Sequence, residues 1–419
     1  MEKILYITNA YPNVGGDTAF IETEMKYVSK KMDEVYVLSH GNINKECVAV
    51  PSNVHILYFN FRKNKLYTLL LCISSLFNSY FWKEVRNIIV KKKKLCCLKE
   101  ALLFLVQAKI EAKQIQKIIT KNKIRLLYTF WFYRSTLACI IAKLKLGIDE
   151  INIFTRTHGF DLYELRNQNN YQAYKIQMTD YVKKIFFISK AGKEYYMKTF
   201  DSVQSNKYKL SYLGTENPTP LKQHTYEKSI NLLSVSYVVP VKRIFLIVDS
   251  LVRCSKENIS IKWTHIGGGS DFFTIKKLAE EKLNNTSISF NFIGELPNQK
   301  VHEYYRTNDV DLFVNMSESE GLPVSMMEAM SFGVPVIAPD VGGVREIVDS
   351  HTGWLLSKDL CNEEFVEVIK EWCNYSSEQK KQKSQNAYNK WNLYFNAEKN
   401  YTEFVEQLCG INKNEINLP

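Results

Sequence analysis

The chain has 419 residues, of which 45% are hydrophobic, 13% aromatic and 24% charged. This composition excludes an intrinsically disordered or fibrous protein, and at roughly 150 residues per domain the length predicts two or three domains with cores of their own. Its 55 Lys and Arg residues outnumber its 44 Asp and Glu residues, a net charge of +11, which favours acidic partners such as phosphates or an anionic membrane surface. Nucleic acid is not an expected partner, because no zinc finger, RRM signature or helix-turn-helix is visible.

The cysteines and the apolar segments of the sequence indicate in which cellular compartment the protein is expected. The nine cysteines have no C-x-x-C spacing, which predicts neither a disulfide framework nor a zinc site and favours a reducing cytosol. The apolar run at the start is too short for a signal peptide, and the most apolar window, Leu66–Phe77, is shorter than the ~20 residues that span a bilayer. We therefore expect a cytoplasmic protein, soluble or peripheral on the inner face of the cell membrane.

In the first half of the chain, predicted strands alternate with predicted helices, which is typical of a parallel sheet with crossover helices. A basic, apolar stretch at 66–105 interrupts this alternation and predicts two helices. The predicted strands lie within Lys3–Thr8, Glu34–Ser39, His55–Phe59, Ile124–Trp131, Ile151–Gly159 and Lys183–Gly192, and the predicted helices within Thr18–Lys31 and Arg134–Leu146.

Residues Tyr208–Pro220 have no periodicity and contain Gly214 and two prolines, so they are predicted to link two domains. After Asn231 the same alternation begins again, which predicts a second doubly wound domain. A single amphipathic helix is expected over Trp391–Leu408. Ligands of such sheets bind beyond the carboxyl ends of the strands.

The segment Asn315–Val348 carries the strongest chemical signal. A predicted strand ends at Ser317, a polar turn follows, and Pro323 is expected to open a helix. The start of that helix favours an anion such as a diphosphate. Glu320 could face a sugar, and Glu328 could accept hydrogen bonds from ribose hydroxyls; two solvent-facing glutamates beside a sharp turn are the plain alternative. The backbone expected to face the anion is that of Gly321, Leu322, Pro323 and Val324.

This segment resembles the donor-binding signature of the family 4 retaining glycosyltransferases. The similar parts are the E-G-L-P-V turn, the second glutamate followed by Ala, the G-x-P-V-I-A strand and the G-G-x-x-E-I-V tail. The resemblance implies an α/β GT-B fold with two Rossmann-like domains facing across a cleft and a C-terminal helix that crosses back. We expect an acceptor-binding domain at 1–210, a nucleotide-sugar domain at 211–385, and C-terminal helices at 386–419 that pack toward the first domain.

Further donor contacts follow from the same resemblance. Lys242 falls on the family's phosphate-binding lysine, whereas the usual Gly-Arg pair is Ser236-Tyr237 here, so a second basic ligand is missing and Arg243 is the candidate replacement. Gly267 belongs to the family's Gly-rich turn. Backbone around Gly294 and Leu296 would pass beside the nucleobase.

In the first domain, Gly15 and Gly16 follow the first strand, where such enzymes place a loop over the donor phosphates. The H-G-F-D string begins with His158 at a predicted strand end and resembles that of colanic-acid and amylovoran glycosyltransferases. The resemblance places this histidine beside the donor sugar and the acceptor; a structural histidine is the alternative.

Residues 66–105 have two interpretations. Lys91–Lys94 and Arg86, with the aromatic residues of 77–82, would form a basic aromatic surface for an anionic membrane beside a lipid-linked acceptor. Alternatively, two helices pack on the core and the lysine run is solvated.

The resemblance implies a metal-independent enzyme without a cofactor that transfers a sugar from a UDP- or GDP-linked donor, with retention, to a saccharide acceptor on a polyprenyl carrier. Bacterial capsule, O-antigen or exopolysaccharide assembly is the expected pathway. Lys242 and the helix start would stabilise the leaving diphosphate, Glu320 would orient the donor sugar, and His158 would position the acceptor hydroxyl or the sugar. A GT-B nucleotide-sugar epimerase and an inactive nucleotide-sugar binder remain alternatives.

Overall fold

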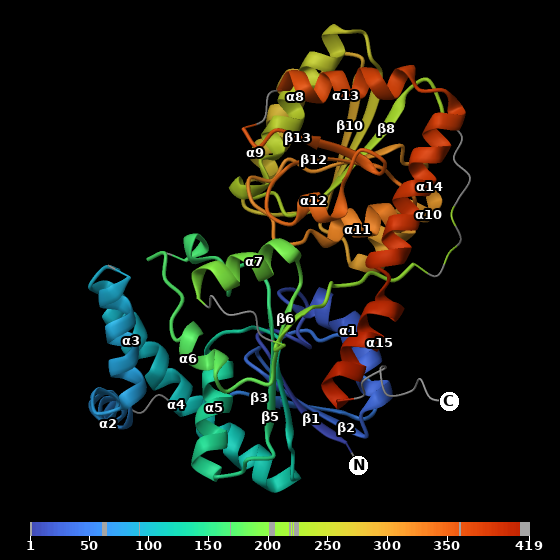
Figure 1. Cartoon of the computed structure of the whole chain (residues 1–419). Coiled ribbons are helices and arrows are strands. Elements are labelled where there is room, and N and C mark those ends of the chain that lie inside the picture. Colours follow the sequence, from blue (N-terminus) through green and yellow to red (C-terminus); the bar gives the residue numbers. More distant parts are fainter. Residues whose placement is uncertain are drawn as a thin grey trace. The chain divides into compact units, whose positions relative to one another are not determined.

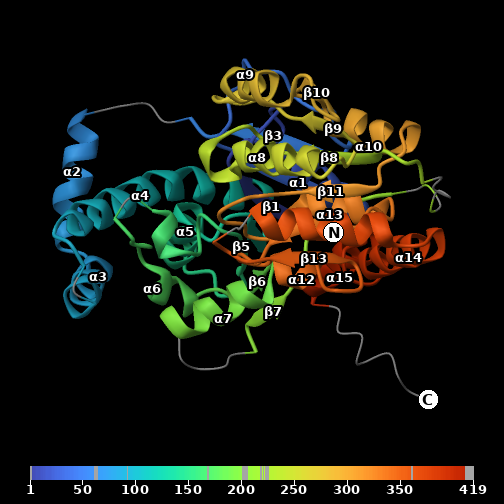
Figure 2. The same cartoon turned by 90° about the horizontal axis from the view of Figure 1, so that it is seen from above.

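The structure is a computed structural model that describes residues 2–60, 65–91, 93–167, 169–200, 206–217, 219, 221, 226–359 and 362–410. The chain forms two compact units. Unit 1 comprises Met1–Tyr212 and Tyr401–Pro419, and unit 2 comprises Leu213–Asn400. Each unit contains one parallel sheet with helices on its two faces (Figures 1 and 2).

Unit 1 is built on seven strands in the order β3-β2-β1-β4-β5-β6-β7, and all six neighbouring pairs are parallel. Because the strand order reverses between β1 and β4, the loops after these two strands diverge at the carboxyl edge, which is the usual ligand position. The strands are β1 (Lys3–Thr8), β2 (Glu34–Ser39), β3 (Val54–Tyr58), β4 (Leu126–Thr129), β5 (Asn152–Thr157), β6 (Lys184–Phe187) and β7 (Tyr208–Leu210).

Helices α4 and α5 cover one face of this sheet, and α1 and α15 cover the other (Figure 1). Residues of α15 from Tyr401 onward belong to unit 1, where Phe404 packs edge-on against Tyr128 and Phe186. The helices are α1 (Thr18–Lys31), α2 (Lys65–Leu76), α3 (Ser79–Val90), α4 (Cys96–Asn122), α5 (Arg134–Leu146), α6 (Lys175–Thr179), α7 (Lys190–Thr199) and α15 (Ala397–Cys409).

Unit 2 has six parallel strands in the order β10-β9-β8-β11-β12-β13. A cluster of buried apolar residues joins one face of the sheet to α8, α9 and α13. The strands are β8 (Ile230–Val235), β9 (Ile261–Ile266), β10 (Ile288–Gly294), β11 (Leu312–Val314), β12 (Val336–Pro339) and β13 (Gly353–Leu356). The helices are α8 (Ile244–Lys256), α9 (Phe272–Leu283), α10 (Asn298–Thr307), α11 (Val324–Ser331), α12 (Val344–Ile347), α13 (Asn362–Asn374) and α14 (Ser377–Tyr394).

Three sequence predictions of secondary structure were wrong in detail. The predicted linker begins with β7, because the backbone on either side of it bonds to β6; Pro218 and Pro220 lie outside the described residues. The stretch 66–105 contains α2, α3 and the start of α4, since Asn78 caps α3 by accepting from the Tyr80 N–H. The predicted single helix at 391–408 is interrupted after Tyr394, where the residues on either side of Asn396 bond to the backbone of Thr215.

A buried ion pair ties the second face of the unit 1 sheet to its helices. Arg156 on β5 donates to Glu24 on α1 at 2.6 Å, and both side chains are fully buried. Tyr6 donates to the other Glu24 oxygen at 2.8 Å, and the Arg156 guanidinium stacks 4.2 Å from the Phe404 ring centre. Burial raises the pKa of Glu24, and the charge of Arg156 opposes that rise.

We expect Arg156→Met to destabilise unit 1 by about 3–5 kcal/mol, because Glu24 would remain as a buried charge without its partner. Thermal unfolding followed by circular dichroism measures the loss. The double variant Glu24→Gln/Arg156→Met should recover most of it, since no isolated charge is left. A double variant as unstable as Arg156→Met alone would show that the pair's charges do not control the stability.

Candidate functional site

Lys242 and Glu320 form an ion pair at the carboxyl edge of the unit 2 sheet. Lys242 ends a short 3-10 turn after β8, and Glu320 lies in the turn between β11 and α11. Their Nζ and Oε1 atoms are 2.6 Å apart, and Asn315 Nδ2 also donates to Glu320 Oε1 at 3.3 Å. The lysine side chain retains 23% of its exposure, against 10% for the glutamate. The ammonium group of Lys242 is therefore accessible to a ligand, and the less exposed Glu320 carboxylate lies in contact with it.

Backbone crowding fixes the turn that carries Glu320. A Cβ on Gly342 would lie 1.9 Å from the Glu320 carbonyl oxygen, and one on Gly343 would lie 2.3 Å from that of Gly321. The Gly343 N–H donates to this second oxygen at 2.9 Å. Only glycines permit this approach, so the G-G-x-x-E-I-V tail shapes the E-G-L-P-V turn directly.

Helix α11 begins immediately after this turn. Pro323 is its N-cap residue with extended backbone, and Val324 is the first helical residue, one position later than predicted. The N–H groups of the first helical turn have no acceptor within the helix, which favours an anion beside Gly321 and Leu322.

Glu328 lies on α11 and is held by α10. Its Oε1 accepts from Asn298 Nδ2 at 2.5 Å and lies 3.5 Å from His302 Nε2. The residue is 7% exposed. A carboxylate fixed in this way is suited to accepting hydrogen bonds from a diol.

The Gly-rich turn after β9 packs against the loop after β8. Gly267 has φ +146°, and a Cβ there would lie 1.8 Å from the Ser236 carbonyl oxygen. Its N–H donates to the carbonyl of Gly294, which has φ +88°, at 2.8 Å. The three strand ends β8, β9 and β10 are thus joined through backbone contacts, and Leu296 follows them half-buried.

The Arg243 side chain, the candidate phosphate contact, also forms hydrogen bonds with the backbone. It has left-handed backbone (φ +48°), and its guanidinium donates to the carbonyls of Met316 at 2.8 Å and Ser317 at 3.1 Å. Burial lowers its pKa. Two of its three nitrogens therefore hold the backbone that follows β11, while Tyr237, in place of the family's arginine, points its hydroxyl at Glu295.

In unit 1 the Gly15-Gly16 turn is organised by Asp17. Gly15 and Gly16 have φ +92° and +62°. The Asp17 carboxylate accepts from the N–H groups of Asn9, Ala10 and Tyr11, and from the indole of Trp131 at 3.0 Å. Thr8 adds its hydroxyl at 2.9 Å. The loop after β1 is thus fixed to the loop after β4 by one buried carboxylate.

His158 follows β5 at the same edge and lies against Phe130 and Trp131, with ring centres 4.3 and 4.6 Å away. The Asp161 carboxylate accepts from the backbone N–H of His158 at 2.7 Å. It therefore fixes the backbone and makes no hydrogen bond with the imidazole ring. Neither ring nitrogen has a hydrogen-bond partner among the described residues. Burial lowers the pKa of His158 to about 4. A neutral imidazole without partners is suited to a ligand hydroxyl, which can both donate and accept.

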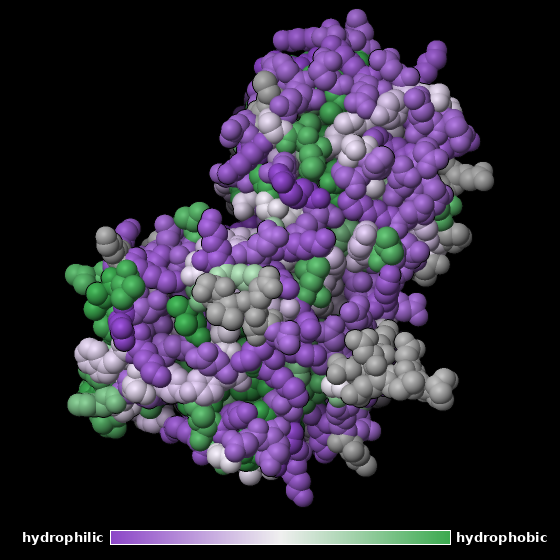
Figure 3. Space-filling view, in the orientation of Figure 1, coloured by the Kyte–Doolittle hydropathy of each residue, from purple (hydrophilic) through white to green (hydrophobic). Residues whose placement is uncertain are grey.

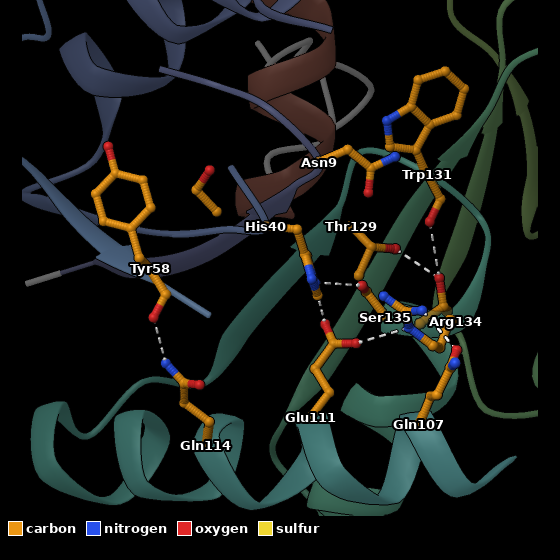
Figure 4. A network of polar contacts seen from close by, with 12 residues as sticks. Asn9, His40, Tyr58, Gln107, Glu111, Gln114, Thr129, Trp131, Arg134 and Ser135 are labelled. Carbon is orange, nitrogen blue, oxygen red and sulfur yellow. Dashed lines mark hydrogen bonds and ion pairs between the residues drawn. The ribbon is translucent and has the colours of Figure 1, made fainter. Parts of the chain in front are cut away.

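A polar network links α4 to the strand ends of unit 1 (Figure 4). The fully buried Glu111 carboxylate lies 2.9 Å from His40 Nε2 and 3.5 Å from Arg134 Nε. Burial raises the pKa of Glu111, but His40, Ser135 and Arg134 together hold it below its usual value. Ser135 Oγ also approaches His40 Nε2, at 3.4 Å. Because serine and carboxylate meet the same nitrogen, this arrangement lacks the geometry of a hydrolytic triad.

Within unit 2 the structure brings together Lys242, Glu320 and the start of α11, with Glu328 one turn farther along that helix. His158, Gly15 and Gly16 lie in unit 1. Sequence reasoning missed three groups of residues that hold these elements. They are Asp17, the His40–Glu111–Arg134 network, and the Asn298–His302 pair on α10. The position of Asp17 directly after Gly15-Gly16 is the sequence feature that could have identified it.

Burial of His158 makes unit 1 sensitive to acid. Its pKa is about 4 in the folded chain and about 6.5 in an unfolded one. The unfolded state therefore binds the proton first, and stability falls as the pH drops from 6.5 to 4, by roughly 3 kcal/mol in total. We expect His158→Gln to remove this part of the pH dependence, measured by urea unfolding between pH 4 and 7.5. His55→Gln, at an exposed position, is the control, and an unchanged slope in His158→Gln would contradict the expectation.

Comparison with known proteins relates unit 2 to a family. Residues 219–390, less than half of the chain, match the model of the family "Glycosyl transferases group 1". The O-antigen biosynthesis glycosyltransferase WbnH of Escherichia coli is 25% identical over 167 residues, 40% of this chain and 44% of that protein. The match thus spans less than half of this relative. An uncharacterized glycosyltransferase of Methanocaldococcus jannaschii, MJ1178, is 25% identical over 70% of this chain and 78% of its own.

Solved structures identify the fold over the whole chain. The lipopolysaccharide outer core galactosyltransferase WaaB superposes with a TM-score of 0.69 at 15% identity, covering 97% of this chain and 99% of that one. HepE of Anabaena, in complex with UDP and glucose, gives 0.63 at 15% identity over 98% and 100% of the two chains. The fold is that of the GT-B glycosyltransferases, which confirms the fold class predicted from the sequence.

Proposed function

We propose that this chain is a retaining glycosyltransferase of bacterial cell-surface polysaccharide assembly, with a nucleotide-diphosphate sugar as donor and a saccharide as acceptor. The observation that carries the proposal is the Lys242–Glu320 pair directly before α11, inside the segment that matches the glycosyltransferase family. Relatives named for O-antigen and colanic acid biosynthesis support the pathway. A neighbour solved with UDP and glucose supports the donor class, UDP- or GDP-linked.

Unit 2 supplies charge stabilisation to the leaving diphosphate in this proposal. The Lys242 ammonium is the reachable member of its pair, so a phosphate oxygen competes with Glu320 for its protons. The first turn of α11 adds backbone donors that are already in position. These groups take the role that a metal ion has in other transferases, so the proposed reaction needs no metal and no cofactor. Glu320, released from part of its contact with Lys242, orients the donor sugar and supports positive charge that develops at the sugar carbon.

Unit 1 binds the acceptor in this proposal, and His158 holds a substrate hydroxyl. The imidazole is neutral at physiological pH because of its burial. It therefore positions a hydroxyl without carrying charge, and the leaving phosphate is the group that takes the acceptor proton. We further propose that the acceptor is attached to a polyprenyl carrier, which places the enzyme at the inner face of the cell membrane.

Replacing Lys242 or Glu320 by alanine should lower kcat by about 100-fold or more, the usual scale for one preorganised charge-stabilising group. The measurement is release of UDP or GDP from purified protein incubated with nucleotide sugars and a short soluble acceptor, with the anomeric configuration of the product read by NMR.

Lys300→Ala is the matched control, because Lys300 forms a similarly short pair with Glu303, 2.7 Å, on the exposed face of α10. It should leave turnover unchanged. Near-normal turnover in a folded Lys242→Ala or Glu320→Ala variant would remove that residue from the mechanism. Nucleotide-sugar binding without turnover on any acceptor would favour an inactive binder.

Glu328→Gln should act on donor affinity. Contacts to the ribose are the same before and during the reaction, so their loss raises KM for the donor and leaves kcat nearly unchanged. Initial rates at varied donor concentration separate the two constants. Ser331→Ala, a change three residues farther along α11, is the control for damage to the helix. A large loss of kcat at constant KM in Glu328→Gln would contradict the ribose assignment.

A further inference from the structure

Helix α2 is strongly apolar, yet it adds no residue to the core of unit 1. Its side chains Leu66, Leu69, Leu70, Ile73 and Leu76 are all exposed, with Leu66 retaining 67% of its surface. None of the described α2 residues belongs to the core cluster of unit 1 or to the partly buried shell around it. Positions 66, 69, 70, 73 and 76 follow the three- and four-residue spacing of one helix face. This apolar stripe therefore faces solvent in the isolated chain.

Helix α3 has two sides of different character. Phe81, Glu84 and Ile88 are buried in unit 1, where Glu84 accepts from Tyr171 at 2.6 Å and Gln177 at 2.9 Å. The opposite side carries Trp82, Ile89 and Val90, and all three are exposed. The helix is anchored by its inner side, so the outer side is presented by a fixed element.

Helix α2 is also anchored, through polar contacts. Lys109 of α4 donates to the buried Ser75 hydroxyl at 2.8 Å. Helices α2 and α3 lie at the same end of α4, far from the sheet, in both views of the fold (Figures 1 and 2). Hydrophobic side chains gather at this margin of the surface (Figure 3). We call the outward apolar residues of α2 and α3, together with Phe77 between them, the α2–α3 face.

The exposed charges of the sequence stretch that forms this face are all positive. Within Leu66–Lys99 the single acidic residue of the sequence is Glu84, and it is buried. The exposed charged residues among the described part of this stretch are Lys83, Arg86, Lys94 and Lys99. An apolar face surrounded by cations matches an anionic lipid surface, where apolar side chains enter the acyl boundary and cations meet the head groups.

The predicted lysine run contributes less than its sequence suggests. Lys91 donates to the Thr199 carbonyl at 2.9 Å, and Lys93 forms an ion pair with Glu164 at 2.8 Å. Burial lowers the pKa of Lys91. Lys92 lies outside the described residues. Two of the four lysines are thus used to hold the α3–α4 connection against unit 1.

We propose that the α2–α3 face is a docking surface for an anionic bilayer, in which α2 lies in the membrane interface and does not cross it. Among the described residues, no helix is long and apolar enough to span a membrane. The proposal deepens the proposed function by assigning the membrane contact to particular residues, and the surface argument stands without any assumption about catalysis.

The test is cosedimentation of the full chain with vesicles that contain phosphatidylglycerol. The triple variant Leu69→Gln/Ile73→Gln/Leu76→Gln should lower the affinity for these vesicles by roughly 100-fold. Each substitution removes the free energy that an apolar side chain gains on entering the acyl boundary. The matched control is Ile43→Gln/Leu144→Gln/Leu165→Gln, three exposed apolar residues elsewhere in unit 1. The control should bind as the unaltered chain does.

A second pair of variants tests the charges. Lys83→Gln/Arg86→Gln should weaken binding by about fivefold per charge, whereas Lys121→Gln and Lys117→Gln on the far part of α4 should not. Vesicles of phosphatidylcholine alone should bind the native chain more weakly than anionic ones.

Equal pelleting of the native chain and the α2 triple variant would overturn the proposal. So would a native dimer, seen by analytical ultracentrifugation, that the triple variant converts to a monomer, because the face would then be covered by a second copy. Turnover of a short soluble acceptor is measured in parallel. Binding without turnover leaves the docking surface in place and refutes the proposed function, and turnover without binding does the reverse.

Discussion

Parallel pairing sends the carboxyl end of every strand in a sheet to the same edge, and both units of this chain place their polar residues there. In unit 2 this brings together the loop after β8, which carries Lys242, and the turn after β11, which carries Glu320. In unit 1 it brings the loops after β1, β4 and β5 around Asp17, Trp131 and His158. Without this constraint, residues so far apart in sequence would have no reason to meet.

Buried carboxylates at both edges have polar partners, whereas the His158 ring at the unit 1 edge has none among the described residues. In unit 2 the carboxylates of Glu320 and Glu328 are compensated by neighbours, an ammonium in one case and an amide with an imidazole in the other. In unit 1 His158 is compensated by nothing among the described residues, and its burial keeps it neutral. Unpaired polar atoms that are buried cost stability, so they are retained where a ligand completes them. The charged pair suits an anionic donor, and the neutral histidine suits a hydroxyl.

At the α2–α3 face it is apolar side chains that lack partners, because they are exposed to solvent. Large exposed apolar patches on a soluble protein usually mark a contact with a partner or a membrane. Here the anchors Ser75 and Glu84 face inward, so the polar groups of these helices stabilise the fold and the apolar ones are presented outward. The proposed site of sugar transfer and the proposed membrane contact thus lie on separate elements of the chain.

Local sequence patterns predicted most strands and helices, the second doubly wound domain and the turn between β11 and α11, because hydrophobic periodicity and glycine positions are local signals. Helices α1 and α5 and strand β2 agree with the predicted ranges residue for residue. Packing in three dimensions sets the contacts of Lys242 with Glu320, of Arg243 with the backbone after β11, and of Lys91 and Lys93 with unit 1. It also decided the added strand β7 and the break before α15, since each depends on bonds to a segment distant in sequence. A side chain's partner is set by the packing of whole elements, and no pattern within a single element records it.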